Sequence, residues 1–318
     1  MSVSHEPWRN RRFPHIHDHK QRLLSESYQH GCPDHSNFRS ISRNARKNCT
    51  IASSSSSSCP DKVMDIEGKC ALVVDGTSGV GFAFADELLK MKASKVVITG
   101  LDAYKGTETA SKLNKRYGPA RVDFYQADIS NPLEFENMFK YIKNNFEALD
   151  IFFNNAEIHK GKDVITTNFV SNIQGITLAC KNMKGGSVIV NHTSALGLDP
   201  DSDMVAQSAA SAGFMVTSTA FGKNKYFEKT QIRMMTLCSE LQIPSMCFEG
   251  MRPYKRYELE EYKNIQILIA KSASYLVKYG PKNTLWLCQR SGVLSMVELQ
   301  TLNQFIEKYE PSIAVEKS

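Results

Sequence analysis

The segment Lys69–Leu89 constrains the fold of this chain more than any other part, and its sequence is KCALVVDGTSGVGFAFADELL. It predicts a buried strand at Cys70–Val74, a glycine-rich turn and an apolar helix that extends to about Leu89. Such a turn gathers backbone N–H groups and the positive end of the helix around one point, which suits the pyrophosphate of a dinucleotide. The spacing G-x-x-G-x-G alone is a weak signal.

Strands and helices continue to alternate after this unit, and apolar residues recur at helical spacing within the helices. The alternation predicts a parallel sheet covered by helices on both faces, an α/β fold. The expected strands are Lys95–Thr99, Arg121–Tyr125, Asp150–Phe153 and Ser187–Asn191, and the expected helices are around Ala110–Tyr117, Glu134–Phe146 and Val164–Asn182.

The first 63 residues have a different composition from the rest of the chain. They hold six of the eight histidines, a run of serines at Ser53–Ser58, and ten Lys or Arg against five Asp or Glu. Few of these residues can build a core, so we expect residues 1–63 to be a disordered extension and residues 64–318 to be one domain. Because the extension carries most of the positive charge, the domain is nearly neutral, and no nucleic-acid surface is expected on it.

The extension leaves several interpretations open. The alternating His15, His17 and His19 can bind a transition metal, although a solvated arm without function is favoured and no metal site is expected. The Arg and Ser content resembles a mitochondrial presequence, but its acidic residues argue against one. Met64 is a natural start for the domain.

Cysteine usage and hydropathy indicate the cellular setting. The eight cysteines include no C-x-x-C pair, and several lie in apolar runs typical of reduced core thiols. The sequence has no signal peptide and no apolar run of about eighteen residues, the length of a membrane-spanning helix. We therefore expect a cytoplasmic protein without a membrane span.

Further landmarks follow in a fixed order: QADIS at 126–130, NNAE at 154–157, Asn168 and GGSVIVNHTSALGLDP at 185–200. With these residues the chain resembles the short-chain dehydrogenase/reductase family, and within it the insect alcohol dehydrogenases and 15-hydroxyprostaglandin dehydrogenases. The resemblance covers about residues 67–304. It implies a Rossmann-type, doubly wound sheet of about seven strands. It adds a sixth strand at Thr230–Cys238, a helix near Glu258–Tyr279 and a last strand at Thr284–Leu287.

The family's catalytic pair departs from its pattern here. Members use Tyr-x-x-x-Lys on the helix after the fifth strand, helped by a loop serine and a helix asparagine. The resemblance gives Ser194 and Asn168 as counterparts of the last two, but it places Gln207 and Ser211 at the tyrosine and lysine positions. Neither replacement supplies an acidic proton or a positive charge, and loss of one general acid or base costs about 10²- to 10⁴-fold in rate.

These departures leave alternatives open. Tyr226 and Lys229 are a substitute pair, but they are three residues apart rather than four and lie in the expected loop before the sixth strand. Ser194 and Asn168 can also be a loop hydroxyl and a helix amide kept only for hydrogen bonding. A mis-spliced region around 201–212 is a third possibility, which the unchanged length of the flanks argues against.

The cofactor positions have changed as well. Asp75 replaces a glycine of the family's turn, Glu157 replaces the glycine of N-N-A-G, and Gly100 stands where an acid binds the adenine ribose. Ser239 and Glu240 replace a Pro-Gly pair near the nicotinamide. Added carboxylates oppose phosphate binding, so we expect NAD to bind weakly or not at all. The counterparts of NAD-binding residues are Gly76, Ser78, Gly79, Gly81, Asp128, Asn154 and Ala156, and Asp102, two residues after Gly100, is a substitute for the missing ribose-binding acid.

Two functions follow from the resemblance. The first is a non-catalytic binding or self-associating protein, a pseudoenzyme that forms a homodimer or homotetramer through helices near 134–146 and 164–182. The second is an NAD-dependent alcohol dehydrogenase with atypical residues, such as Ser194 with a bound water. Met and aromatic residues at about 240–256 either line a pocket for a small apolar alcohol or lipid, or only pack the loop. The Gln207/Ser211 pair favours the first function, so we favour a protein without enzymatic activity.

Overall fold

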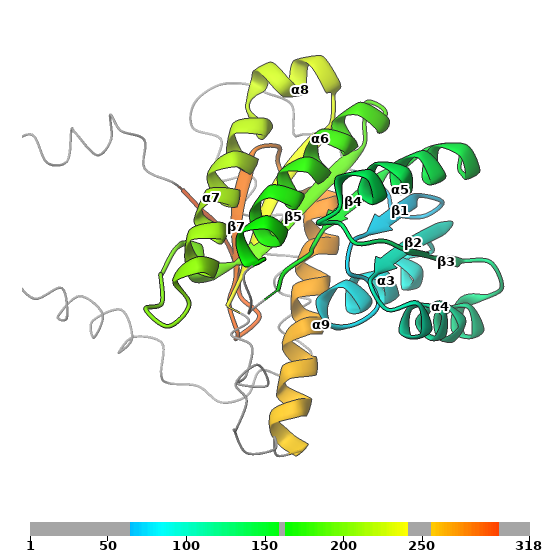
Figure 1. Ribbon diagram of the computed structural model, residues 1–318, viewed down its shortest axis with the longest axis horizontal. Coiled ribbons are helices and arrows are strands. Elements are labelled where there is room, and N and C mark those ends of the chain that lie inside the picture. The colour runs from blue at the N-terminus through cyan, green and yellow to red at the C-terminus, as the bar shows by residue number, and fades with distance from the viewer. Residues whose placement is uncertain (1–63, 159–162, 241–255, 299–318) are drawn as a thin grey trace, which may run out of the picture. The chain divides into compact units, whose positions relative to one another are not determined.

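The computed structural model describes residues 64–158, 163–240 and 256–298 (Figure 1). The expected extension at 1–63 and most of the expected substrate loop lie outside these residues. The described part forms one eight-stranded sheet in the order β3-β2-β1-β4-β5-β6-β7-β8. The strands are β1 (Cys70–Val73), β2 (Lys95–Gly100), β3 (Val122–Gln126), β4 (Ile151–Asn154), β5 (Val188–Ser194), β6 (Arg233–Ser239), β7 (Thr284–Cys288) and β8 (Leu294–Val297).

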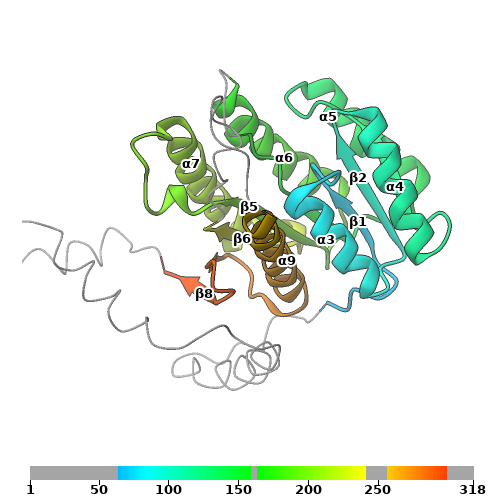
Figure 2. The same ribbon diagram turned by 90° about the horizontal axis from the view of Figure 1, so that it is seen from below.

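Helices cover both faces of this sheet (Figure 2). Apolar side chains of α3, α4 and α9 form one buried layer with the strands, and those of α5, α6 and α7 form the other. The helical elements are α3 (Gly79–Lys90), α4 (Ala103–Tyr117), α5 (Pro132–Asn145), the π-helix η1 (Thr166–Ser171), α6 (Asn172–Asn182), the 3₁₀ turn η2 (Ala195–Gly197), α7 (Val205–Gly222), α8 (Asn224–Thr230) and α9 (Arg256–Tyr279).

The strands explain this double cover, because they are apolar on both faces. In β1, Ala71 and Val73 join the layer under α3 and α9, while Leu72 joins the opposite layer. Strands buried on both faces belong to parallel sheets. Strands β1 to β7 are parallel to their neighbours, and β8 alone runs antiparallel, to β7.

The predicted parallel α/β fold is confirmed, with local differences. The sheet has eight strands rather than about seven, because a short edge strand, β8, follows β7. Strand β5 continues to Ser194, so this residue ends a strand rather than lying in a loop. Thr230 belongs to α8 rather than to the sixth strand, and α8 also holds Tyr226 and Lys229, which were expected in a loop. The helix expected at Val164–Asn182 contains the π-helix η1.

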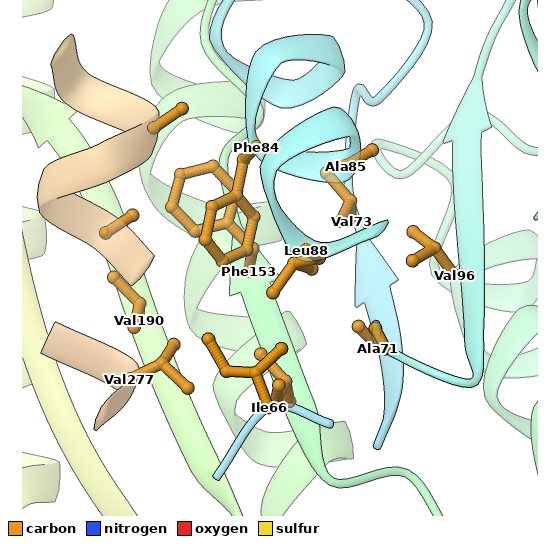
Figure 3. Close-up of a cluster of buried hydrophobic side chains, with 14 of the residues drawn as sticks. Ile66, Ala71, Val73, Phe84, Ala85, Leu88, Val96, Phe153, Val190 and Val277 are labelled. Carbon is orange, nitrogen blue, oxygen red and sulfur yellow. The ribbon is translucent and has the colours of Figure 1, made fainter. Parts of the chain in front are cut away.

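Two phenylalanines form the centre of the layer under α3 (Figure 3). Phe84 of α3 and Phe153 of β4 are both fully buried, and their ring centroids lie 4.3 Å apart. Aromatic pairs at this distance add to the stability gained by burial alone. Phe153 directly precedes the strand end where polar residues begin, so this contact also fixes the position of that end.

Replacing Phe84 by Ala should lower the free energy of unfolding by about 3–5 kcal/mol, because it leaves a cavity against Phe153. Tyr104→Ala on α4 is the matched control, since Tyr104 is 82% exposed, and it should change the free energy by less than about 0.5 kcal/mol. Urea denaturation of the full chain measures both. Equal effects of the two substitutions would contradict the described packing.

Candidate functional site

The carboxyl ends of the parallel strands meet at one edge of the sheet, and two cavities lie there. One has a volume of about 270 Å³, and we name it the serine cavity. Its lining residues are Ser194, Ala195, Leu196, Asp199, Ser239, Glu240 and Arg290. The other has a volume of about 240 Å³, and we name it the acidic cavity. Its lining residues are Val74, Asp75, Thr99, Gly100, Leu101, Ala127, Asp128, Ile129, Ser130, Ala156, Glu157, Ile158, Asp163 and Thr167.

Two of the expected site residues converge on the main chain of Ile158. Asn168, in η1, accepts from the Ile158 N–H at 2.8 Å and donates through Nδ2 to the Ile158 carbonyl at 2.7 Å. Gln207, in the first turn of α7, approaches the same carbonyl with Nε2 at 3.5 Å. Each amide therefore holds the chain that follows β4, and Asn168 uses both its donor and its acceptor in doing so.

The positions aligned with the catalytic pair are buried and neutral. Gln207 is 2% exposed and Ser211, one turn further along α7, is 1% exposed. An amide and a hydroxyl at these sites give no charge that could lower a neighbouring pKa. Neither residue lines the serine cavity or the acidic cavity. The geometry therefore offers no proton-exchanging group at the two positions.

Ser194 lines the serine cavity, which Asn168 and Gln207 do not line. Ser194 Oγ accepts from the Leu196 N–H at 3.2 Å and so caps the turn η2. The substitute pair Tyr226 and Lys229 is exposed on α8, and neither residue lines a described cavity.

The glycine-rich turn keeps its backbone form. Gly79 has a φ of +61°, a conformation that suits glycine. A Cβ on Gly81 would lie 2.2 Å from the Asp75 carbonyl oxygen, and one on Gly76 would lie 2.8 Å from Ile98. These glycines therefore allow close packing of the turn on its own strand and on β2. Ser78 precedes α3 and makes no side-chain cap, so its hydroxyl does not occupy the first N–H groups of the helix.

Asp75 adds an acidic side chain to this turn. It has a φ of +51°, which is unfavourable for a residue with a Cβ. The surrounding protein raises the pKa of its carboxyl, and the nearby Lys105 ammonium opposes this effect.

Only part of the expected nucleotide-binding set lines the acidic cavity. Asp128 and Ala156 do, and one Asp128 oxygen is held by the N–H and hydroxyl of Ser130. Asp102 instead caps α4 by accepting from the Lys105 N–H at 3.0 Å, and it does not line the cavity. Asn154 is buried and donates to the Asn172 carbonyl at 2.8 Å. Its role here is to join β4 to α6.

A buried chain of hydrogen bonds crosses the strand ends, and sequence reasoning missed it. Asn155 donates through Nδ2 to the Val74 carbonyl at 3.2 Å, which leaves its Oδ1 to accept from His192 Nδ1 at 2.8 Å. The other ring nitrogen, Nε2, then accepts from the Ser239 hydroxyl at 3.0 Å. This pattern assigns the ring proton to Nδ1. The only sequence signal was a histidine continuing the inward alternation of Val188 and Val190 in β5.

Burial lowers the pKa of one group at this edge and raises the pKa of another. Desolvation lowers the pKa of His192 to about 4, so the ring is neutral at physiological pH. Desolvation also raises the pKa of Glu157 to about 7. Part of the Glu157 side chain is accessible through the acidic cavity, but protein surrounds the carboxyl and replaces much of its water.

Among the described residues, no group of three or more His, Cys, Asp or Glu is placed to hold a metal ion. No helix among residues 64–158, 163–240 and 256–298 is long and apolar enough to cross a membrane. Within the same ranges, Cys70, Cys180, Cys238 and Cys288 are free thiols.

Comparisons with known proteins agree with the architecture. A family profile described as short chain dehydrogenase matches residues 69–241. Human 15-hydroxyprostaglandin dehydrogenase (NAD⁺) is 27% identical over 183 residues, which are 55% of this chain and 68% of that protein. Alcohol dehydrogenase 2 of Ceratitis rosa is 27% identical over 187 residues, 56% of this chain and 71% of that one. A short chain dehydrogenase from Burkholderia cenocepacia J2315, solved with NADP, has a TM-score of 0.60 at 19% identity, covering 72% of this chain and 99% of the other.

The pKa shifts of His192 and Glu157 predict that the two groups change the free energy of unfolding with pH in opposite directions. The unfolded chain protonates His192 below about pH 6.5 and the folded chain only near pH 4, so this residue makes stability fall as pH falls. Glu157 takes up its proton at about pH 7 when folded but at 4.5 when unfolded, so it makes stability fall as pH rises. The two effects oppose each other between pH 4.5 and 6.5.

Glu157→Gln should therefore make the free energy of unfolding rise more steeply with pH across this window than in the parent, by up to about 1.4 kcal/mol per pH unit. His192→Gln should change the slope by a similar amount in the opposite direction. Urea denaturation of the parent and both variants at a series of pH values measures this. Profiles parallel to the parent in both variants would contradict the burial of these two groups.

Proposed function

This chain belongs to the short-chain dehydrogenase family, and we propose that it does not perform the family's hydride transfer and acts as a non-catalytic binding or self-associating protein. The observation that carries the proposal is the arrangement around Ile158. Asn168 and Gln207 both direct their amides at its main chain, and Ser211 lies buried one turn along α7. Two neutral, buried groups thus stand where the family's reaction needs an acid and a cation.

The cofactor side supports the same proposal. Asp75 and Glu157 place carboxyl groups at the edge where the turn and the strand ends would meet a dinucleotide. When these carboxyl groups are ionised, a phosphate beside them meets like charge in a partly desolvated place, where repulsion is stronger than in water. Gly76 and Gly81 are needed for the packing of the turn itself, so their presence is not evidence of ligand binding. We therefore propose that NAD binding is weak or lost.

Self-association has its own structural support. Exposed apolar side chains lie on or near the helices of one face of the sheet, on α5, η1 and α7. They are Leu133 (62% exposed), Val170 (52%), Val205 (66%) and Val216 (63%). Exposed apolar side chains also lie on α4, α9 and β8, so these four are one part of the apolar surface that self-association would bury. We propose that these helices form the interface of a homodimer or homotetramer in the cytoplasm.

Titration of NADH into the full chain tests the proposal. We expect no saturable binding at millimolar NADH, read by NADH fluorescence, while human 15-hydroxyprostaglandin dehydrogenase serves as the binding control. Asp75→Gly, which removes a carboxyl group and relieves a positive φ, should give a larger fluorescence change than the parent at the same NADH concentration. Micromolar binding by the parent would contradict the proposal and favour an NAD-dependent alcohol dehydrogenase with atypical residues.

A further inference from the structure

The amino ends of β5, β6 and β7 form the edge of the sheet opposite to the two cavities, and lysines gather there. Six lysines lie on or beside the segments that lead into these strands, and we name them the lysine edge: Lys181, Lys184, Lys223, Lys225, Lys229 and Lys282. The first five are exposed and Lys282 is half-buried. The helix α8, which carries two of them, lies at one end of the fold (Figure 1).

Contacts between these segments make the lysine edge one continuous surface. The Gly186 N–H, just before β5, donates to the carbonyl of Gln231, at the end of α8, at 2.8 Å. The Lys282 ammonium, just before β7, lies 3.9 Å from the centre of the Phe227 ring of α8. Lysines that are far apart in the sequence are therefore neighbours around α8.

The lysine edge is strongly positive in a domain that is nearly neutral. Acidic side chains are fewer on the neighbouring segments, where they are Glu228 on α8 and Glu147, whose carbonyl accepts from the Lys184 ammonium at 3.3 Å. Three of the lysines form no ion pair with any described residue: Lys223, Lys225 and Lys229. Such a concentration of one sign of charge attracts an anionic partner.

Helix stabilisation explains only part of this pattern. Lys181 and Lys229 lie in the last turns of α6 and α8, where a cation complements the helix dipole. Lys225 lies in the first turn of α8, where the dipole disfavours a cation, and Lys184 lies in the turn beyond α6. The dipole therefore does not account for these last two lysines, whereas an anionic partner would.

We propose that the lysine edge binds the anionic surface of a phospholipid bilayer as a peripheral contact. Separate lysines suit a charged plane, because each ammonium acts as a point charge without the directional pairing that an arginine makes. Tyr226 lies among them on α8 and is 43% exposed. A tyrosine ring, with an apolar body and a polar tip, suits the head-group layer of a membrane.

This contact is separate from the candidate site. None of the six lysines lines the serine cavity or the acidic cavity. The inference goes beyond the proposed function by naming a partner surface, and it does not depend on whether a dinucleotide binds. NADH titration tests the proposed function and vesicle binding tests the lysine edge, so the failure of one is distinguishable from the failure of the other.

Co-sedimentation of the full chain with lipid vesicles measures the contact at physiological ionic strength. Vesicles of phosphatidylcholine mixed with phosphatidylserine supply the anionic surface, and vesicles of phosphatidylcholine alone are the neutral comparison. We expect saturable binding to the anionic vesicles that is at least about tenfold tighter than binding to the neutral ones. No binding to the anionic vesicles, or equal affinity for both kinds, would overturn the inference.

A triple variant identifies the lysines responsible. Lys223→Gln, Lys225→Gln and Lys229→Gln, combined in one chain, remove three exposed charges on and beside α8. The affinity for anionic vesicles should fall about tenfold or more, because each lysine beside an anionic membrane contributes about fivefold. An affinity equal to that of the parent would overturn the inference.

The matched control removes the same charge elsewhere. Lys105, Lys112 and Lys263 are exposed on α4 and α9, outside the lysine edge, and are replaced together by Gln. The basic segment 1–63 is present in both triple variants, so any binding through it is common to both. The control should bind anionic vesicles as tightly as the parent does. An equal loss of affinity in the two triple variants would overturn the lysine edge as the contact.

Two further measurements locate the contact and identify the partner. Amide hydrogen exchange of the parent should become slower at residues 223–230 with anionic vesicles and not with neutral ones, and slowing confined to other residues would overturn the inference. A DNA duplex is the competing anionic partner. Binding of the duplex that is tighter than binding of the vesicles at the same ionic strength, and that the α8 substitutions abolish, would assign the lysine edge to nucleic acid instead.

Discussion

Strands that are buried on both faces impose the constraint from which the rest of the structure follows. Such strands run parallel, and parallel strands bring all their carboxyl ends to one edge. Here β1, β4, β5 and β6 lie side by side in the sheet. The polar residues that follow their apolar runs must therefore meet, and they must satisfy one another where water is excluded. Any site that this fold offers is built from those residues.

At this edge the chain uses neutral hydrogen bonds. The His192 ring lies between Asn155 and Ser239, and the amides of Asn168 and Gln207 hold Ile158. These groups fix strand ends and the chain after β4 without placing a charge in a buried region. The same arrangement gives no acid or cation for proton exchange. At Gln207 one side chain both approaches the Ile158 carbonyl and leaves the family's tyrosine position without an acidic proton.

Much of the fold could be predicted from local patterns, because strand and helix signals are short-range. The segment Lys69–Leu89 predicted β1, the turn and α3 within one or two residues. Strand β8 was missed because four residues with two exposed side chains give no clear pattern. Ser194 was expected in a loop, since β5 continues through polar residues that the apolar signal does not cover.

The site was harder to predict than the fold. Its contacts depend on strand order rather than on neighbouring sequence. His192 bonds to partners 37 and 47 residues away, which only the adjacency of β4, β5 and β6 brings together. Asp102 caps α4, a local role that competes with any reach toward a ribose. The Gln207 and Ser211 substitutions could be seen in the sequence. Their burial could not, nor could the approach of both Asn168 and Gln207 to the Ile158 main chain.

The rate of NADH formation tests most directly whether this chain has lost the family's reaction. The full chain would be incubated with saturating NAD⁺ and a panel of secondary alcohols, with human 15-hydroxyprostaglandin dehydrogenase as the active reference. We predict no NADH formation above a blank without protein, and no difference between the parent and Ser194→Ala. Turnover by the parent that Ser194→Ala abolishes would contradict the proposed loss, because a reaction would then proceed without the family's tyrosine and lysine.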